Sequence, residues 1–416
     1  MWKIQDEFDI AVIGGGPAGL MAAARAAASG ARVVLVEKNL NPGKKLLLSG
    51  GGRCNISHAE FDDKKFAQKF GQNGQWLLSA LASFGAEETI EFFEAMGLKT
   101  ITEKDGRVFP ASGQAQDVLA TLFKSLKENK VKLMLGKEVL GFELKDEAII
   151  SAQLAEREIL AQAYVLCVGG RSYPITGSTG QGYEWAQAMG HKIVNPRPAL
   201  VPIKIKESWV GGLQGISLKN VEVSFWQKNK NLAKAAGDIL FTHFGLSGPT
   251  ILDLSKSVGE ALAKGGVVLK IDLMPGLNIM ALDKKLQEDF KRNKNIRNYL
   301  SEFFPQRFSD SLLHLSRISP DKKLSFITKE ERETLLGILK GLELNVKDLL
   351  GFNEAIITAG GVELKEIDSK TMRSKKIKNL YFAGEMIDLD GPTGGYNLQL
   401  CWTTGFVAGA SAGNNA

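Results

Sequence analysis

A chain of 416 residues is too long for one compact core, and the usual size of domains predicts two or three of them. Hydrophobic residues form 44% of the chain and charged residues 24%, as in soluble globular proteins, and no apolar run is long enough to span a bilayer. The formal net charge of +6 favours a polyanionic partner over a small cation.

Residues 1–7 carry acids where a signal peptide needs a basic region followed by an apolar stretch, and we therefore expect a cytoplasmic protein. The chain contains three cysteines, Cys54, Cys167 and Cys401, without CxxC spacing. Such a set indicates neither a disulfide framework nor a zinc site, and we expect no metal. The missing CxxC also argues against a pyridine-nucleotide disulfide reductase.

The segment 9–38 predicts a strand, a turn, a helix and a second strand. The first apolar run has no charge and is rich in branched residues, as in a parallel strand buried on both faces. Gly14, Gly16 and Gly19 fill the GxGxxG positions, which serve a tight turn, the approach of a pyrophosphate, and close helix packing. Glu37 ends the second strand, where a carboxylate can accept both ribose hydroxyls of an adenosine. Strand context, spacing and terminal acid together argue against an ordinary glycine turn and predict a dinucleotide site.

A glycine-rich segment, residues 41–57, directly follows the ribose-binding strand. The three consecutive glycines at 50–52 allow the backbone to lie flat against a ring, while Lys45 and Arg53 can meet phosphate or the charge of a reduced flavin. A solvated, flexible linker is the alternative, and the three leucines beside the glycines argue against full solvation.

Amphipathic helices and short strands are predicted next. Apolar positions recur at helical spacing over residues 71–97, with a break at Gly85, and again over 114–129. A buried strand at 163–168 ends in Gly169, a second place where the backbone can meet a cofactor. Shorter strands are predicted before it, at 131–135, 138–144 and 148–154.

The pattern changes after Gly190, where several prolines mark the exit from the first domain. Residues 200–273 alternate apolar and polar side chains, which predicts an antiparallel barrel or sandwich. A Lys-rich helical segment follows, and two strands then resume the β region. The predicted helices are 282–291, 296–304 and 329–340, and the predicted strands are 342–346 and 354–358. The helices are therefore inserted in the β region, which is itself inserted in the nucleotide domain.

A second glycine signature lies near the C-terminal end. Residues 380–385 form a short apolar strand that ends in Ala-Gly-acid. In two-signature flavoproteins such a strand returns to the first sheet. Its acid, here Glu385, hydrogen-bonds the ribityl chain of the flavin, and its glycine, here Gly384, lacks the side chain that would block the approach of that chain. Gly394 and Gly395 then open a helix whose N-terminus would stabilise negative charge at N1 and O2 of a reduced flavin. A surface turn capping a helix is the alternative, and the N-terminal fingerprint favours the flavin.

These segments resemble the bacterial flavoprotein family known as BaiN-like or aminoacetone-oxidase-like, which includes the YhiN proteins. The likeness lies in residues 43–55, 105–110, 240–249, 358–362 and 383–405, which span essentially the whole chain. The resemblance implies an α/β fold in which an FAD-binding Rossmann domain of the glutathione-reductase type is interrupted by an antiparallel β-barrel domain and a small helical domain. The expected FAD-binding parts are 1–194 and 359–416, the barrel parts 195–274 and 341–358, and the helical insert 275–340.

The resemblance also implies particular contacts to FAD. It places Ala18, Glu37, Glu385, Asn397 and Leu398 at positions expected to touch the cofactor, and it assigns backbone contacts with adenine to the residue at 139. Motif and resemblance together give the expected FAD-binding set: Gly14, Gly16, Pro17, Ala18, Gly19, Glu37, Lys38, Lys45, Ser49, Gly51, Gly52, Arg53, Asn55, Val139, Gly169, Gly384, Glu385, Gly394, Gly395, Asn397 and Leu398.

Candidate catalytic residues are few. Cys54, in the glycine loop, can protonate a carbon opposite hydride delivery if its thiol stays neutral, and a buried packing residue is the alternative. His243 lies in a Gly- and Ser-rich turn of the kind that often reaches another domain's site, and a structural histidine is the alternative. His58, near the glycine loop, is a weaker candidate. Arg107 either binds an anionic substrate or pairs with a surface acid.

Three function classes follow from a flavin that accepts or delivers a hydride. The first is reduction of a carbon–carbon double bond, for which the resemblance implies a uracil in ribosomal RNA, giving dihydrouridine. The second is oxidation of a small amine with oxygen as acceptor. The third is a non-catalytic FAD-containing RNA-binding protein. No second GxGxxG marks an NAD(P)H domain, so NAD(P)H would act only as an external reductant.

An RNA substrate would call for basic residues that contact phosphates, and the helical insert offers them. A solvated charged face is the alternative, since acids at 283, 288 and 289 dilute the run. The candidate residues are Lys284, Lys285, Lys291, Arg292, Lys294 and Arg297.

Overall fold

A computed structural model describes residues 4–415 and divides into two compact units. Unit 1 comprises Met1–Pro198 and Ile356–Ala416, and unit 2 comprises Ala199–Ala355. The chain therefore leaves unit 1 after Pro198 and returns to it at Ile356. The helical insert belongs to the same unit as the barrel, because the two share one hydrophobic core.

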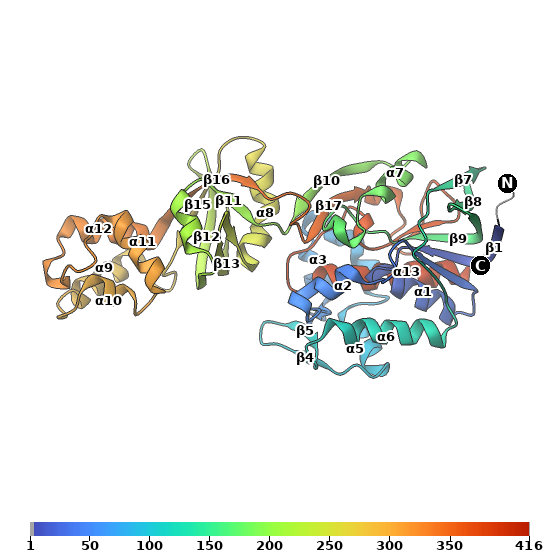
Figure 1. Ribbon diagram of the computed structural model, residues 1–416, viewed down its shortest axis with the longest axis horizontal. Helices are drawn as coiled ribbons and strands as arrows, with labels where there is room; N and C mark the ends of the chain where they lie inside the picture. Colours follow the sequence, from blue (N-terminus) through green and yellow to red (C-terminus); the bar gives the residue numbers. More distant parts are fainter. Residues whose placement is uncertain (1–3, 416) are drawn as a thin grey trace. The chain divides into compact units, whose positions relative to one another are not determined.

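Unit 1 is built on a seven-stranded sheet with the order β6-β2-β1-β9-β8-β7, in which β18 also pairs with β9 (Figure 1). The strands β6, β2, β1, β9 and β18 run parallel, and β8 and β7 add antiparallel edges. Ile10–Ile13 and Val33–Val36 are buried on both faces, as their uncharged branched residues predict. The bounds are β1 (Ile4–Ile13), β2 (Val33–Glu37), β6 (Lys132–Leu135), β7 (Gly141–Lys145), β8 (Ala148–Gln153), β9 (Arg157–Leu166) and β18 (Leu380–Phe382).

Two helices pack closely against each other on this sheet, α1 (Pro17–Ala28) and α13 (Tyr396–Asn414). A Cβ on Gly405 would lie 2.4 Å from the carbonyl oxygen of Ala18, and one on Gly409 would lie 2.3 Å from that of Ala22. Missing side chains therefore bring the two helix backbones into contact, so the N-terminal and C-terminal signatures share one platform.

The remaining helices of unit 1 are short, apart from α6. The predicted break at Gly85 is confirmed, because α5 begins directly after it. Residues 71–77, predicted as α-helix, form a 3₁₀ turn instead, since the chain folds so tightly that a Cβ on Gly74 would lie 1.8 Å from the carbonyl oxygen of Ala67. The helices are α2 (Lys44–Leu48), α3 (Asp63–Gln68), α4 (Leu78–Leu81), α5 (Ala86–Ala95), α6 (Ala115–Glu128) and α7 (Gln181–Ala188).

Two small sheets complete unit 1. One has the order β3-β5-β4, with β3 (Ser57–His58), β5 (Arg107–Pro110) and β4 (Thr100–Thr102). The other pairs β10 (Ile193–Ala199) with β17 (Ile357–Val362). The prediction that residues 354–358 form a return strand of the barrel is therefore wrong, because the observed strand β17 pairs with β10 in unit 1. An apolar run does not specify which strand it pairs with. Gly360 and Gly361 let this strand pass close to other backbone, with carbonyl oxygens 2.6 and 2.5 Å from their Cβ positions.

Unit 2 contains a closed barrel with the order β11-β14-β13-β12-β15-β16 (Figure 1). The alternating pattern allowed a barrel or a sandwich, and because the sheet closes on itself, the barrel is the observed alternative. Inward positions such as Val223, Phe225 and Leu344 are buried, and their neighbours face outward. The bounds are β11 (Ile203–Ile205), β12 (Ser217–Gln227), β13 (Lys230–Thr242), β14 (Gly245–Ser247), α8 (Pro249–Leu262), β15 (Val268–Asp272) and β16 (Leu342–Leu349).

The helical insert consists of α9 (Ile279–Asp289), α10 (Ile296–Leu300), α11 (Gln306–Ser316) and α12 (Lys329–Gly341). Three of these correspond to predicted helices, and α11 was not predicted. Thr328 opens α12 with a capping box to Glu331. Among residues 4–415, no helix combines the length and the apolar character needed to cross a membrane.

Candidate functional site

The turn between β1 and α1 has the backbone geometry that the GxGxxG positions predict. Gly14 has φ +105°, and a Cβ there would lie 2.6 Å from the carbonyl oxygen of Cys167. A Cβ on Gly19 would lie 1.8 Å from the carbonyl oxygen of Gly14, so only glycine lets the helix pack this closely on the strand. Gly16 is different, because no heavy atom lies within 4 Å of its Cβ position. The N-terminus of α1 is thus open to a phosphate at this residue.

Glu37 is the last residue of β2 and is buried. Its Oε2 accepts a hydrogen bond from the Gly15 N–H at 2.7 Å, and its Oε1 accepts from the backbone N–H and the side-chain amide of Asn39, both at 2.7 Å. A carboxylate offers about four acceptor positions, so capacity remains for a ribose hydroxyl. Asn39 also accepts from Lys44 Nζ at 2.8 Å and donates to the Thr176 carbonyl at 3.0 Å. Asn39 therefore orients the acid, and sequence reasoning missed it.

The glycine loop follows a left-handed path. Gly50, Gly51, Gly52 and Cys54 have φ values of +57°, +66°, +87° and +59°. Nothing lies within 4 Å of the Cβ positions of Gly51 and Gly52. The loop therefore presents bare backbone, which suits a flat ring. At Cys54 the same conformation is strained, because an L-residue pays roughly 1–2 kcal/mol in the left-handed region.

Cys54 itself has no exposed surface. Burial raises the pKa of its thiol to about 12, so the sulfur keeps its proton at neutral pH. The neutral form is the one that a proton donor requires. Burial also raises the pKa of Cys401 to about 12 and that of Cys167 further. All three cysteines are therefore neutral thiols, and Cys54 alone combines this state with a strained backbone in the loop.

The segment after the loop is joined to the start of α13 by three hydrogen bonds. The indole Nε1 of Trp402 donates to the Ile56 carbonyl at 2.9 Å. The Ser57 hydroxyl donates to Gln399 Oε1 at 2.6 Å, and His58 Nδ1 lies 3.1 Å from the Gly394 carbonyl oxygen. These contacts bring the glycine loop and the second glycine turn together, although more than 330 residues separate them in sequence.

Asn55 leaves a buried polar atom without a partner at this junction. Its side-chain oxygen forms no hydrogen bond with any described residue and lies 3.0 Å from the Cβ position of Gly395. A buried acceptor without a donor costs about 1–3 kcal/mol, which a ligand N–H would remove. The first N–H groups of the 19-residue helix α13 face the same turn and carry partial positive charge.

These features fit FAD. The open turn at Gly16 suits the pyrophosphate, Glu37 suits the ribose, and the bare loop at Gly51 suits the ring. The unpaired oxygen of Asn55 suits the ring N–H of the flavin pyrimidine. The chemistry of each group therefore matches one part of the cofactor.

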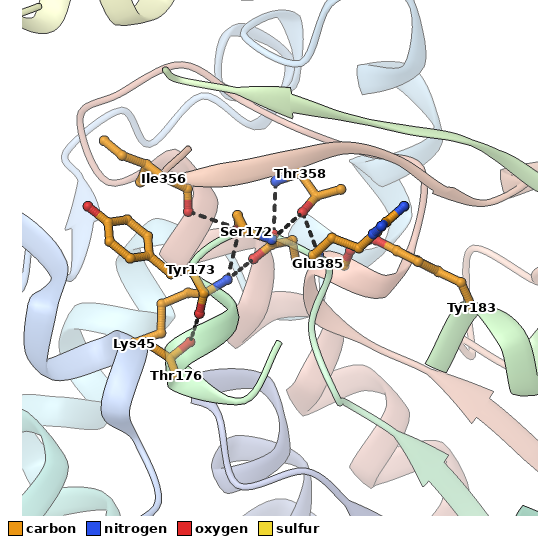
Figure 2. A network of polar contacts seen from close by, with 9 residues as sticks. Lys45, Ser172, Tyr173, Thr176, Tyr183, Ile356, Thr358 and Glu385 are labelled. Carbon is orange, nitrogen blue, oxygen red and sulfur yellow. Dashed lines mark hydrogen bonds and ion pairs between the residues drawn. The ribbon is translucent and has the colours of Figure 1, made fainter. Parts of the chain in front are cut away.

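Glu385 is the centre of a polar network that Figure 2 shows in detail. Its Oε1 accepts from the Thr358 N–H at 2.9 Å and from the Ser172 hydroxyl at 2.7 Å, and its Oε2 pairs with Lys45 Nζ at 3.0 Å. A Cβ on Gly170 would lie 2.7 Å from the same carboxylate, so glycine is required there. The carboxylate thus joins four chain segments. Ser172 and Thr358 were not identified from the sequence.

The basic residues near the loop have acidic partners. Arg53 Nη2 lies 2.7 Å from Glu103, and its guanidinium stacks over Phe109 at 3.8 Å. Arg107 contacts the same Glu103 at 2.9 Å and Asp105 at 2.7 Å. Of the two alternatives for Arg107, pairing with an acid is therefore the observed one.

Other expected cofactor residues of unit 1 lie in the turns around this site. Lys38 Nζ lies 3.4 Å from the Thr179 hydroxyl. The Val139 carbonyl accepts from Gln181 at 3.4 Å, in the loop before β7 where a strand was predicted. Gly384 packs against Ala18, with a Cβ position 2.8 Å from the Ala18 methyl.

The remaining residues that were expected to contact FAD have different local environments. Asn397 closes its own turn through two hydrogen bonds with Gly391, both at 2.9 Å. Leu398 is half-buried, and Gly169 has φ +74°. The Ser49 hydroxyl donates to the Leu46 carbonyl at 2.6 Å.

His243 lies in unit 2, in the turn between β13 and β14, and its ring is exposed. The ring makes a T-shaped contact with Phe244, with centroids 4.8 Å apart. His243 and Cys54 therefore belong to different units. Among the described residues, no group of three or more His, Cys, Asp or Glu side chains is placed to hold a metal ion.

Two glycine signatures that meet on one Rossmann sheet define an FAD-dependent oxidoreductase. The chain belongs to the HI0933-like protein Rossmann domain family, whose sequence model matches residues 8–411. The predicted family resemblance is thereby confirmed.

Curated relatives match over nearly their whole length. A 3-dehydro-bile acid Δ(4,6)-reductase of Clostridium scindens is 32% identical over 408 residues, covering 97% of this chain and 98% of the relative. A ribosomal RNA dihydrouridine synthase of Escherichia coli is 29% identical, covering 97% of each chain. A protein of the same name from Haemophilus influenzae is 28% identical, covering 96% of this chain and 97% of the relative.

Solved structures share the fold at low identity. A 3-ketosteroid Δ1-dehydrogenase from Sterolibacterium denitrificans superposes with a TM-score of 0.57 at 15% identity, covering 99% of this chain and 100% of the other. A 3-ketosteroid-Δ4-(5α)-dehydrogenase from Rhodococcus jostii gives a TM-score of 0.56 at 14% identity, covering 99% and 98%. The predicted fold class is thus confirmed.

Proposed function

We propose that this protein uses FAD to reduce a carbon–carbon double bond conjugated with a carbonyl group, and that its substrate is a uridine in ribosomal RNA. The relatives have different substrates by name, a bile acid and ribosomal RNA, and both names describe reduction of a conjugated enone-type bond. A uracil ring and a 3-oxo-Δ4 steroid share this group, which accepts a hydride at its β carbon and a proton at its α carbon.

The junction between the glycine loop and the N-terminus of α13 is the observation that carries the proposal. Bound FAD would supply the hydride there. The N-terminus of α13 would stabilise negative charge on the ring, and the bare backbone of Gly51 and Gly52 would allow close contact with one of its faces. Cys54, in the same loop, holds a proton on Sγ, and we assign it as the candidate proton donor. NAD(P)H is the proposed external reductant.

The charge of the helical insert supports an RNA substrate. Residues 275–340 contain 13 Lys and Arg against nine Asp and Glu, so they hold most of the chain's net charge of +6. Not every cation is available, because Arg292 and Lys294 both pair with Glu302, at 2.9 and 2.5 Å. Within residues 4–415, five exposed cations of the insert have no acidic partner, and one of them, Arg307, donates instead to the Gly212 and Gln214 carbonyls at 3.2 and 3.1 Å. The other four are the proposed phosphate contacts: Lys284, Lys291, Arg317 and Lys323.

The substrate is tested by asking what reoxidises the reduced enzyme. The flavin is photoreduced without oxygen and then mixed with ribosomal RNA that carries unmodified uridine, with a 3-oxo-Δ4 bile acid, or with air-saturated buffer. We expect the RNA to reoxidise it fastest and dihydrouridine to form in the RNA. Fastest reoxidation by oxygen, with an amine as the best reductant, would instead establish an oxidase. RNA binding without any reoxidation would establish a non-catalytic role.

The phosphate contacts are tested separately. Reversing the charge of Lys284, Lys291 and Lys323 to Glu should weaken RNA binding and lower the slope of log K against log salt by about one unit per lost contact. The matched control is Arg292→Glu, which removes a cation already paired with an acid. An unchanged salt slope in the triple variant would remove this role from the insert.

A further inference from the structure

The ring of His58 lies between two glycine turns that are far apart in sequence. On one side, a Cβ on Gly106 would lie 2.7 Å from His58 Nε2. On the other side, a Cβ on Gly394 would lie 3.7 Å from His58 Nδ1. Both glycines have positive φ, +84° and +108°, so both turns use a conformation that other residues rarely adopt. The imidazole therefore fits against Gly106 only because that position lacks a side chain, whereas a Cβ on Gly394 would be in ordinary van der Waals contact with the ring.

The hydrogen bond between His58 and Gly394 has a defined direction. Nδ1 lies 3.1 Å from the Gly394 carbonyl oxygen, which can only accept. Nδ1 therefore carries a proton and donates it, while Nε2 lies on the side of Gly106. The ring thus fixes the carbonyl of the residue that begins the second glycine turn.

Aromatic contacts hold the same ring against the first residue of α13. His58 stacks on Tyr396 with centroids 4.8 Å apart and planes 23° apart. Tyr396 is buried and packs in turn on Phe66 at 4.8 Å and on Phe70 at 6.4 Å. One side chain therefore contacts both the turn before the helix and the helix start.

We propose that His58 is a positioning residue that sets the Gly394–Gly395 turn and, through it, the orientation of the α13 N-terminus toward the flavin pyrimidine. The proposal rests on the function proposed above, because it requires FAD in this site. A helix N-terminus stabilises a nearby negative charge most when its N–H groups point at that charge. Loss of the Nδ1 donor should therefore weaken binding of reduced FAD more than binding of oxidised FAD.

The test compares two substitutions at the same position. His58→Phe keeps a ring that can stack on Tyr396 but removes the donor, whereas His58→Asn places an amide N–H near the position of Nδ1. We expect His58→Phe to bind reduced FAD about fivefold more weakly relative to oxidised FAD. For a two-electron couple this is a reduction potential more negative by about 20 mV. His58→Asn should stay near the wild-type potential.

A second histidine of unit 1 provides the matched control. His191 is buried, hydrogen-bonds Ser374 at 2.7 Å, and makes a T-shaped contact with Phe382, so His191→Phe removes a histidine of purely structural environment. This control should lower the melting temperature of the apoprotein without moving the potential. Gly106→Ala displaces the His58 ring from its other side and should shift the potential in the same direction as His58→Phe.

Each outcome has a consequence. A wild-type potential in both His58→Phe and Gly106→Ala overturns the proposal. Equal shifts in His58→Phe and His58→Asn overturn the role of the donor. Titration of apoprotein with FAD separates these results from a failure of the proposed function, because a chain that binds no FAD even as wild type would refute the site itself.

Discussion

Gln399 connects the glycine loop to the body of unit 1, and its replacement should be strongly destabilising. Its side chain is fully buried in the first turns of α13. Oε1 accepts from Ser57 at 2.6 Å, and Nε2 lies within hydrogen-bond distance of the Gly85 carbonyl at 2.9 Å and of the Thr89 and Thr403 hydroxyls at 2.7 and 3.0 Å. Gln399→Leu keeps a similar shape but removes every one of these polar contacts.

The magnitude follows from the groups that lose a partner. Ser57 has no exposed surface, and its hydroxyl would lose the acceptor at 2.6 Å and keep only the long contact with the His58 carbonyl at 3.5 Å. The Gly85 carbonyl still accepts from the Thr89 hydroxyl at 2.8 Å, so its loss is smaller. A buried group left unpaired costs about 1–3 kcal/mol, and we therefore expect Gln399→Leu to lower the free energy of unfolding by about 3 kcal/mol.

Urea unfolding of the apoprotein, followed by circular dichroism, measures this change. A double-mutant cycle with Ser57→Ala sharpens it, because Ser57→Ala removes the hydroxyl that Gln399→Leu leaves unpaired. The double variant should then be more stable than the sum of the two single losses predicts, by about 1 kcal/mol. A loss below about 0.5 kcal/mol in Gln399→Leu, or strict additivity in the cycle, would refute the assignment of this network.

Three further predictions concern the thiol, the carboxylate network and the helix contact. Cys54→Ala should retain FAD but lose turnover, and normal turnover would eliminate the proton-donor role. A free thiol has a pKa of about 8.5, whereas burial raises the pKa of Cys54 to about 12. Turnover of the wild-type enzyme should therefore show no loss near pH 8.5 from ionisation of this thiol. Glu385→Gln should lower the free energy of unfolding by about 2 kcal/mol. The control is Glu147→Gln, in an exposed pair with Lys378 at 3.6 Å, which should change it by less than about 0.5 kcal/mol. Equal effects of the two substitutions would contradict a stabilising role of the Glu385 network. Gly409→Ala should destabilise by about 1–3 kcal/mol through contact with the Ala22 carbonyl, and a melting temperature at or above wild type would show that the helices can separate.

Local patterns predicted the parts of unit 1 that depend on neighbouring residues. The buried strands, the fingerprint turn and the terminal position of Glu37 follow from uncharged runs and glycine spacing, and the structure places them as expected. The alternating pattern of residues 200–273 was compatible with a barrel or a sandwich. Only the pairing of β11 with β16 closes the sheet, and that pairing joins residues more than 140 positions apart.

Long-range polar partners were beyond the reach of sequence patterns. Glu385 receives its hydrogen bonds from residues 27, 213 and 340 positions away, which no local spacing reveals. The neighbours of His58 in sequence do not reveal its contact with Gly394, which is 336 positions away. For Arg53 and Arg107, the sequence showed the cations but not that one acid, Glu103, orients both.

The split of unit 1 along the chain has a consequence for biosynthesis. Ribosomes deliver the fingerprint first, and β18 and α13 only after all of unit 2 has been made. At about 5–20 residues per second, the roughly 60 residues from Ile356 onward add about 3–12 s during which α1 lacks its partner helix. Unit 2 is contiguous and can fold in that interval, whereas cofactor loading must wait for α13 to emerge from the exit tunnel and dock.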